Sequence, residues 1–243
     1  MTIRRRLITS RRSRAALPVG GYRPPGPADE LSAEDRETVD AFHRLYYQSW
    51  RAGKGTIDLS WFGHRTLKCP FDLWTYQEII VEVMPDIIVE AGTAFGGSAL
   101  YFATILDALG HGRILSIDTE TQGDPPSHQR IEYISGSSVD PAILARIRAE
   151  SAGGRTMVIL DSDHSQAHVE AELAAYADIV SVGSYLIVED TDINGHPARP
   201  DFGPGPWEAL HTFLASNNDF EVDRSRERFL LTLNPGGYLR RRK

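Results

Sequence analysis

Acidic side chains follow two apolar runs of the chain, at the points where those runs end. The first run ends in Asp161, and the second ends in Glu189 and Asp190. Carboxylates that converge at neighbouring strand ends repel each other unless a cation lies between them. Such hard oxygen ligands favour Mg²⁺, Ca²⁺ or Mn²⁺ over zinc. We therefore predict a divalent metal, Mg²⁺ first, held by Asp161, Glu189 and Asp190. Asp163 and Asp192 are reserve ligands, and helix capping or pairing with arginine is the alternative role for these acids.

Two histidines lie close to these acids in the sequence. A metal that holds a substrate hydroxyl lowers its pKa, and a nearby base then removes the proton. His164 is the candidate catalytic base because an unperturbed imidazole titrates near neutrality, although a structural histidine is an equal alternative. His196 lies in a Gly/Pro-rich segment, residues 193–206, which is typical of a loop over strand ends. We predict that His196 contacts the substrate.

A glycine turn follows the first apolar strand, in the sequence VEAGTAFGGS of residues 89–98. Gly92 permits a tight turn from strand to helix, and Gly96 and Gly97 would keep side chains away from a bound cofactor. The dinucleotide fingerprint G-x-G-x-x-G is absent, and Glu90 directly precedes the turn. A carboxylate there would repel a pyrophosphate but suits a ligand that carries an ammonium group. This favours S-adenosylmethionine (SAM) over NAD.

Further cofactor contacts are predicted at the ends of the next strands. Asp118 lies about 20 residues beyond the glycines, where an acid binds ribose hydroxyls; a simple turn cap is the alternative. Ser137 and Ser138 follow the third strand and are placed in the adenine pocket, with an ordinary polar loop as the alternative. The remaining predicted cofactor contacts are Thr93, Ser98 and Asp161.

The elements that must position these residues alternate regularly. Short apolar runs separated by helices indicate a parallel sheet covered on both faces. We predict an α/β, Rossmann-like class I methyltransferase fold, with a mostly parallel seven-stranded sheet and a C-terminal antiparallel pair. The predicted strands are 86–91, 113–118, 131–135, 156–161, 184–189, 219–223 and 228–233. The predicted helices are 33–51, 72–84, 97–110, 140–151, 165–177 and 206–216, the first with an apolar face that includes Val39, Phe42, Leu45 and Tyr46.

Composition limits the partners and the compartment. Residues 1–30 are predicted to be a flexible arm, basic and then rich in Pro and Gly, ahead of a single domain over 31–243. The chain between its basic ends is too acidic to offer a nucleic-acid surface, since the whole carries a formal charge of −7. No apolar run is long enough to span a membrane. A single cysteine, Cys69, and the absence of a secretory signal favour the cytoplasm.

Several segments together resemble a known family. DIIVEAGTAFGGSA, VILDSDHS, YLIVEDTDINGHP, PDFGPGPWEA and RFLLTLNPGGYLRR are similar to the cephalosporin hydroxylases, a family that includes rhamnosyl and other natural-product O-methyltransferases. The resemblance covers about residues 55–243. It implies a SAM-binding domain, Mg²⁺ at Asp161, Glu189 and Asp190, and a homo-oligomeric enzyme of secondary metabolism, such as antibiotic biosynthesis. The segment containing Lys68 also matches, which places this lysine near the cofactor carboxylate, with a surface lysine as the alternative.

A broader similarity to catechol-type O-methyltransferases affects the choice of base. In those enzymes a catalytic lysine lies three positions after the first metal aspartate, and here that position is His164. The role of His164 as the base is therefore inferred from this chain rather than carried over from that family.

The function predicted from these residues is SAM- and metal-dependent O-methylation of a hydroxyl on a small natural product, such as a glycosyl or macrocyclic antibiotic intermediate. An NAD-dependent oxidoreductase is the first alternative, but its glycine fingerprint is missing. A hydroxylase-type tailoring enzyme would favour two histidines and one carboxylate around iron, whereas this cluster is all carboxylate. A non-catalytic accessory subunit is the third alternative, and the intact acids argue against it.

Overall fold

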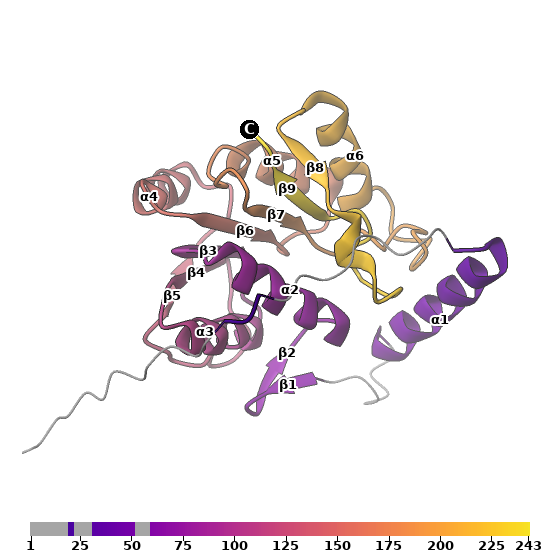
Figure 1. Ribbon diagram of the computed structural model, residues 1–243, viewed down its shortest axis with the longest axis horizontal. Coiled ribbons are helices and arrows are strands. Elements are labelled where there is room, and N and C mark those ends of the chain that lie inside the picture. Colours follow the sequence, from indigo (N-terminus) through magenta and orange to yellow (C-terminus); the bar gives the residue numbers. More distant parts are fainter. Residues whose placement is uncertain (1–18, 22–30, 52–58) are drawn as a thin grey trace, which may run out of the picture.

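Seven strands form the main sheet of the computed structural model, which describes residues 19–21, 31–51 and 59–243 (Figure 1). The strand order is β5-β4-β3-β6-β7-β9-β8. Strands β3 to β7 run parallel, while β9 is antiparallel to both β7 and β8. The strands are β3 (Ile87–Ala91), β4 (Arg113–Asp118), β5 (Ile131–Ser135), β6 (Thr156–Leu160), β7 (Tyr185–Val188), β8 (Phe220–Val222) and β9 (Tyr238–Arg241). The predicted fold class is confirmed.

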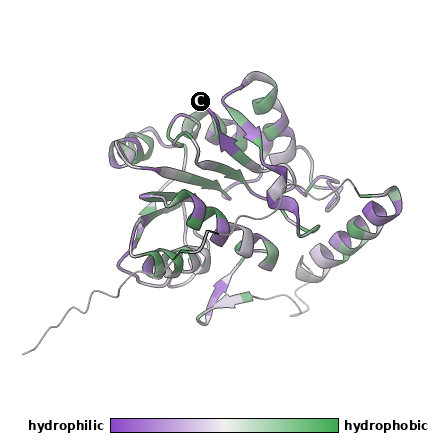
Figure 2. Ribbon diagram, viewed as in Figure 1, coloured by the Kyte–Doolittle hydropathy of each residue, from purple (hydrophilic) through white to green (hydrophobic). Residues whose placement is uncertain are grey.

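Helices cover both faces of this sheet, which explains why its central strands are apolar throughout. Helices α4 (Pro141–Ser151), α5 (Gln166–Tyr176) and α6 (Pro206–Ser216) pack against one face. Helices α2 (Pro70–Val83) and α3 (Gly97–Leu109) pack against the other (Figures 1 and 2). Every residue of β3, β6 and β7 is buried, as expected for strands enclosed on both sides.

The register of the sheet brings the predicted acids to one edge. Leu160 at the end of β6 pairs with Ala91 of β3 and with Val188 of β7. Asp161 and Glu189 are the next residues along their strands, so they leave the sheet side by side. The chain also reverses direction across the sheet between β3 and β6, which is the switch point where open parallel sheets bind ligands.

The closing strand differs from the prediction. Residues 228–233 were expected to form it, but β9 is Tyr238–Arg241 instead. The backbone N–H of Leu233 donates to a carboxylate oxygen of Asp72 (2.9 Å), and Leu230 has a φ of 69°, so this apolar segment is a loop tied to α2. The basic C-terminal residues are also structural, since the Arg241 side chain donates to the Val180 carbonyl (2.5 Å).

Asp72 is a buried carboxylate whose removal is expected to destabilise the protein. It also accepts from the hydroxyls of Thr232 (2.5 Å) and Tyr238 (2.7 Å), and only 2% of its surface is exposed. Burial raises the pKa of Asp72 although these donors oppose the shift. Asp72→Ala leaves three donors without an acceptor and should lower the free energy of unfolding by about 3 kcal/mol in urea denaturation. Asp124→Ala, at an exposed position, is the control, and equal effects of the two variants would contradict this interpretation.

A hairpin that was not predicted lies between α1 (Ala33–Arg51) and α2. Its strands, β1 (Leu59–Trp61) and β2 (His64–Thr66), form a separate antiparallel pair. Trp61 Nε1 donates to Thr104 Oγ1 of α3 (3.1 Å). A Cβ on Gly97 would lie 2.1 Å from the Arg65 carbonyl oxygen. Gly97 therefore makes room for the hairpin, in addition to bordering the predicted cofactor site.

Helix α1 has the predicted bounds, but the predicted apolar face was only partly right, since Val39 and Tyr46 are partly buried. Phe42 and Leu45 are exposed, whereas His43 and Tyr47 are buried. Two contacts fix which side of α1 is buried. His43 Nε2 lies 2.9 Å from a carboxylate oxygen of Asp192, and Tyr47 packs in a small apolar cluster with the loop after β7. Among the described residues, no helix is long and apolar enough to cross a membrane. Most of the predicted arm, 1–18 and 22–30, lies outside the described residues.

Candidate active site

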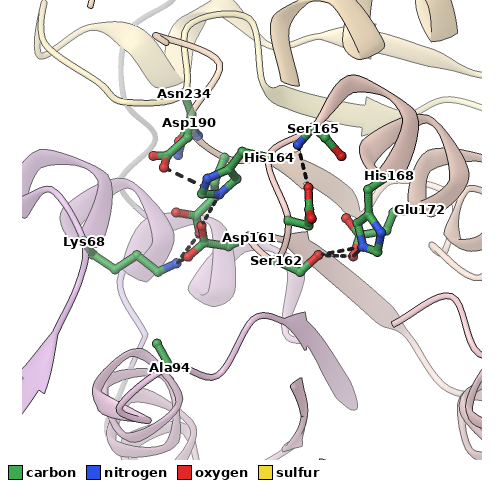
Figure 3. A network of polar contacts seen from close by, with 12 residues as sticks. Lys68, Ala94, Asp161, Ser162, His164, Ser165, His168, Glu172, Asp190 and Asn234 are labelled. Atoms are coloured by element: carbon green, nitrogen blue, oxygen red, sulfur yellow. Dashed lines mark hydrogen bonds and ion pairs between the residues drawn. The ribbon is translucent and has the colours of Figure 1, made fainter. Parts of the chain in front are cut away.

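Asp161 and Asp190 lie close together at the ends of β6 and β7 (Figure 3), and Glu189 is linked to Asp161 through Lys68. His164 Nε2 lies 3.2 Å from Asp161 Oδ1 and 3.6 Å from Asp190 Oδ2. One ligating atom from each of Asp161, His164 and Asp190 lies within 4.8 Å of the others. Lys68 Nζ joins Glu189 to the group, because it donates both to Asp161 Oδ2 and to Glu189 Oε1 (2.6 Å). The three predicted metal acids and the predicted base therefore share one cluster.

The glycine turn lies directly against this cluster. Gly92 has a φ of 100°, and a Cβ there would lie 1.9 Å from the backbone oxygen of Asp161. Any L side chain at this position would push the β3–α3 turn away from the end of β6. Gly92 therefore brings the predicted cofactor turn next to the acids.

Burial and mutual repulsion shift the pKa values of the cluster. Burial raises the pKa of Glu189 well above its ordinary value, and Asp161 adds to this while Lys68 opposes it. Burial likewise raises the pKa of Asp190 to about 7, against the opposing charge of His164. Burial also works to raise the pKa of Asp161, but Lys68 and His164 outweigh it and the pKa is lowered. Burial disfavours the imidazolium of His164, yet Asp190 and Asp161 raise its pKa to about 9.

The residues of the cluster fit a hard divalent cation. Three carboxylates face one lysine and one histidine, and of the three Glu189 is buried while Asp161 and Asp190 are partly buried. Negative charge is therefore in excess unless protons or another cation are added. Oxygen ligands of this kind suit Mg²⁺. Asp161, Asp190 and Glu189 are the residues that would hold it, as the sequence predicts.

A hollow of about 250 Å³ opens between the glycine turn and the acids. It is the natural place for a cofactor, because it joins the end of β3 to the switch point of the sheet. The predicted site residues that line it are Lys68, Gly92, Thr93, Ser98, Asp161, His164 and Asp190. Glu90 lies beneath it, fully buried, and accepts from the Ser116 hydroxyl (2.7 Å).

Other predicted cofactor residues have protein partners in this structure. Asp118 Oδ2 accepts from the backbone N–H groups of Thr93 and Ala94, both at 2.9 Å, so it holds the glycine turn in place. A Cβ on Gly96 would lie 2.8 Å from the Pro125 side chain, so the chain itself fills the space that was assigned to a cofactor. The ribose role of Asp118 stays a prediction.

The two serines after β5 lie in different surroundings. Ser138 is buried, and its hydroxyl lies 3.2 Å from His168 Nε2, which also contacts Ser162 Oγ (3.1 Å). Ser137 Oγ accepts from the Val139 N–H at 3.4 Å. Figure 3 shows that His168 points toward Ser162 and Glu172 and away from Asp161. The adenine contacts of both serines stay predictions.

His196 lies at a second, larger hollow of about 800 Å³. Its ring stacks on Trp207 with centroids 4.4 Å apart, and its Nε2 lies 3.2 Å from Glu208 Oε1. His43 and Pro235 also line this hollow, which shares no lining residue with the one beside Asp161. The predicted base and the predicted substrate contact therefore border different hollows.

The two reserve acids do not join the cluster. Asp163 Oδ1 accepts from the Ser165 N–H (2.7 Å) at the start of α5. Asp192 is fully buried and pairs with His43 of α1 at 2.9 Å. Neither acid fills the predicted alternative role as stated, since Asp163 bonds the backbone of the N-cap residue Ser165 and Asp192 pairs with a histidine rather than an arginine.

Asn234 is a site residue that was not predicted. Its Oδ1 accepts from the backbone N–H of Asp190 (3.1 Å), whose φ is 53°, and its Nδ2 donates to the Tyr76 hydroxyl (3.0 Å). Positive φ is uncommon for a residue with a side chain, so Asn234 helps to hold Asp190 in its conformation. Asn234 lies in one of the segments that carry the family resemblance. That resemblance could have drawn attention to Asn234, but it does not indicate the role of this residue.

A family model described as Rhamnosyl O-methyltransferase/CmcI matches residues 54–242. The chain belongs to this family. The resemblance seen in the sequence is therefore confirmed, and it places the chain among O-methyltransferases. A rhamnosyl O-methyltransferase of Mycobacterium tuberculosis is 38% identical over 221 residues, covering 88% of this chain and 86% of the relative. One from Mycobacterium leprae is 37% identical, covering 89% and 93%.

Solved structures agree on the fold. A structure of CmcI with Mg and SAM has a TM-score of 0.60 and 22% identity, and the match covers 91% of this chain and 90% of that one. The apo structure of a CmcI variant matches with the same TM-score, identity and coverage. The likeness to these structures therefore extends to the architecture of the whole domain.

Proposed function

We propose that the protein transfers a methyl group from SAM to a hydroxyl oxygen with the help of a bound divalent cation. The observation that carries the proposal is the cluster itself. In a chain of an O-methyltransferase family, Asp161, Asp190 and His164 converge within 4.8 Å beside a glycine turn at the switch point of the sheet. This is where a class I sheet binds its ligand.

Membership of an O-methyltransferase family supports SAM as the methyl donor. Acids and bases both line the hollow beside the turn, since Asp161 and Asp190 lie there with Arg65, Lys68 and His164. The fully buried Glu90 adds a negative charge next to the turn, which disfavours a pyrophosphate there. Thr93 and Ser98 line the same hollow, but both are buried, and Thr93 Oγ1 lies 2.7 Å from Ser116 Oγ.

The residues of the cluster divide the work of the reaction. Asp161, Glu189 and Asp190 would hold Mg²⁺ or a similar cation. Such a cation lowers the pKa of a hydroxyl that it binds. His164 would accept the hydroxyl proton if a cation shared the carboxylates that raise its pKa. The rigid strand ends fix the oxygen and the methyl group in line, and this positioning supplies much of the acceleration.

The acceptor is proposed to be a sugar hydroxyl on a small natural product of secondary metabolism. The curated relatives are named rhamnosyl O-methyltransferases. A hydroxyl that reacts at Asp161 and Asp190 would lie at the smaller hollow, whereas His196 and its stacking partner Trp207 lie at the larger one, so the substrate contact of His196 stays a prediction. We further propose a homo-oligomer, as the sequence resemblance implies, and a cytoplasmic location, which the single cysteine favours.

Calorimetry with the purified protein tests the choice of cofactor. We expect SAM and its demethylated product to bind in the micromolar range, and NAD to give no heat under the same conditions. Ser98→Trp, which fills the hollow beside the turn, should abolish the SAM signal. Binding of NAD without binding of SAM would overturn the proposal.

A further inference from the structure

Lys68 is a buried cation that the proposed reaction does not use. Its side chain is only 2% exposed. It comes from the short segment between the β1–β2 hairpin and α2, and it reaches the acids that end β6 and β7 (Figure 3). Its Nζ donates to one oxygen of Asp161 and to Glu189 Oε1 (2.6 Å). Two predicted metal ligands from two strands thus share one ammonium group.

The two oxygens of Asp161 face different side chains. Its Oδ2 accepts from Lys68, and its Oδ1 lies 3.2 Å from His164 Nε2. The Asp190 side of the cluster faces His164, whereas the Glu189 side faces Lys68. One oxygen of Asp161 and one of Glu189 therefore face Lys68, and a metal that bound either of these two would have to displace the ammonium group.

We propose that Lys68 is a built-in counter-cation that neutralises Asp161 and Glu189 when the site holds no metal and competes with the metal for their oxygens. This inference rests on the metal site of the proposed function. It replaces the expected contact of Lys68 with the cofactor carboxylate by a contact with the metal ligands. In this role Lys68 would keep the protein folded without metal, and it would allow the bound metal to exchange readily.

The physical reason lies in the cost of buried charge. A buried carboxylate without a partner is strongly destabilising, and removing one member of a buried ion pair leaves that cost in place. Lys68 meets this cost for two acids at once. The same positive charge, a few ångströms from the place of a divalent cation, repels it and weakens its binding.

Lys68→Met tests the proposal because it keeps the aliphatic stem and removes the charge. Without metal, the thermal midpoint should fall by roughly 5–10 °C. Titration with MgCl₂ in a calorimeter should give a Kd at least about tenfold lower than in the wild type. Mg²⁺ should also raise the midpoint of the variant more than that of the wild type. Lys243→Met, the same change at the exposed end of the chain, is the matched control and should change neither quantity.

The double variant Lys68→Met with Glu189→Gln separates charge from packing. Removing one acid along with its cation should restore much of the metal-free midpoint, whereas a lysine that only packs predicts a further loss. A Kd for Mg²⁺ that is unchanged or higher in Lys68→Met, or no recovery in the double variant, overturns the role of Lys68. A wild type that binds no Mg²⁺ overturns instead the metal site of the proposed function, so the two failures are distinct.

Discussion

Asp161→Asn is expected to lower kcat/KM by roughly 10²–10³-fold and to abolish measurable Mg²⁺ binding. Asp161 is the one acid of the cluster that contacts both Lys68 and His164. Its backbone also lies directly against Gly92 of the glycine turn. The amide has nearly the shape of the carboxylate but lacks its charge. It therefore removes the attraction for the cation and leaves the packing of β6 in place.

The measurement is steady-state methyl transfer together with calorimetric titration of MgCl₂. Asp163→Asn is the matched control, because this acid follows the same strand and binds the backbone N–H of Ser165 without touching the cluster. It should keep most of the activity and all of the metal binding. Equal losses in the two variants would show that the acids act on the fold and not on a metal.

His164→Asn is expected to lower kcat by roughly 10²–10⁴-fold, which is the usual contribution of a general base. The Kd for SAM should stay close to that of the wild type, because the proton transfer lies in the chemical step. His164 Nε2 lies between Asp161 and Asp190, so its removal also deprives these acids of a partner. A loss of roughly 10–100-fold in Mg²⁺ affinity is compatible with a base that also orients the acids, whereas a complete loss would indicate a direct ligand.

His168→Asn separates the base from a general need for histidine on α5. His168 lies one helical turn further along and contacts Ser162 and Glu172 instead of the acidic cluster. We expect the variant to keep kcat within a few-fold of the wild type. If His164→Asn retains nearly full kcat, another group removes the proton, and the proposed mechanism is wrong in that step.

The sheet was predictable because burial on both faces leaves a plain trace in the sequence. Strands β4 and β5 have the predicted bounds, and β3, β6 and β7 differ from their predictions by a residue or two at their ends. The acids that end β6 and β7 could then be placed together from the parallel arrangement alone. The sequence alone was therefore enough to predict that the acids after β6 and β7 lie next to each other.

Contacts between segments that are far apart in the chain could not be predicted from the sequence. The apolar residues 228–233 read as a strand, and only the buried Asp72, 161 residues before Leu233, shows why they form a loop. Lys68 lies 93 residues before Asp161, and no local pattern connects the two. The same holds for His43 and Asp192, whose pairing turns α1 so that Phe42 and Leu45 face outward.

Transfer of a labelled methyl group from SAM to a rhamnosylated acceptor, by protein stripped with EDTA, tests most directly whether the reaction needs a bound metal. We predict that labelled product falls to background after chelation and returns when MgCl₂ is added in excess. Product formation that persists after thorough chelation would contradict the metal-dependent reaction proposed for Asp161, Glu189 and Asp190.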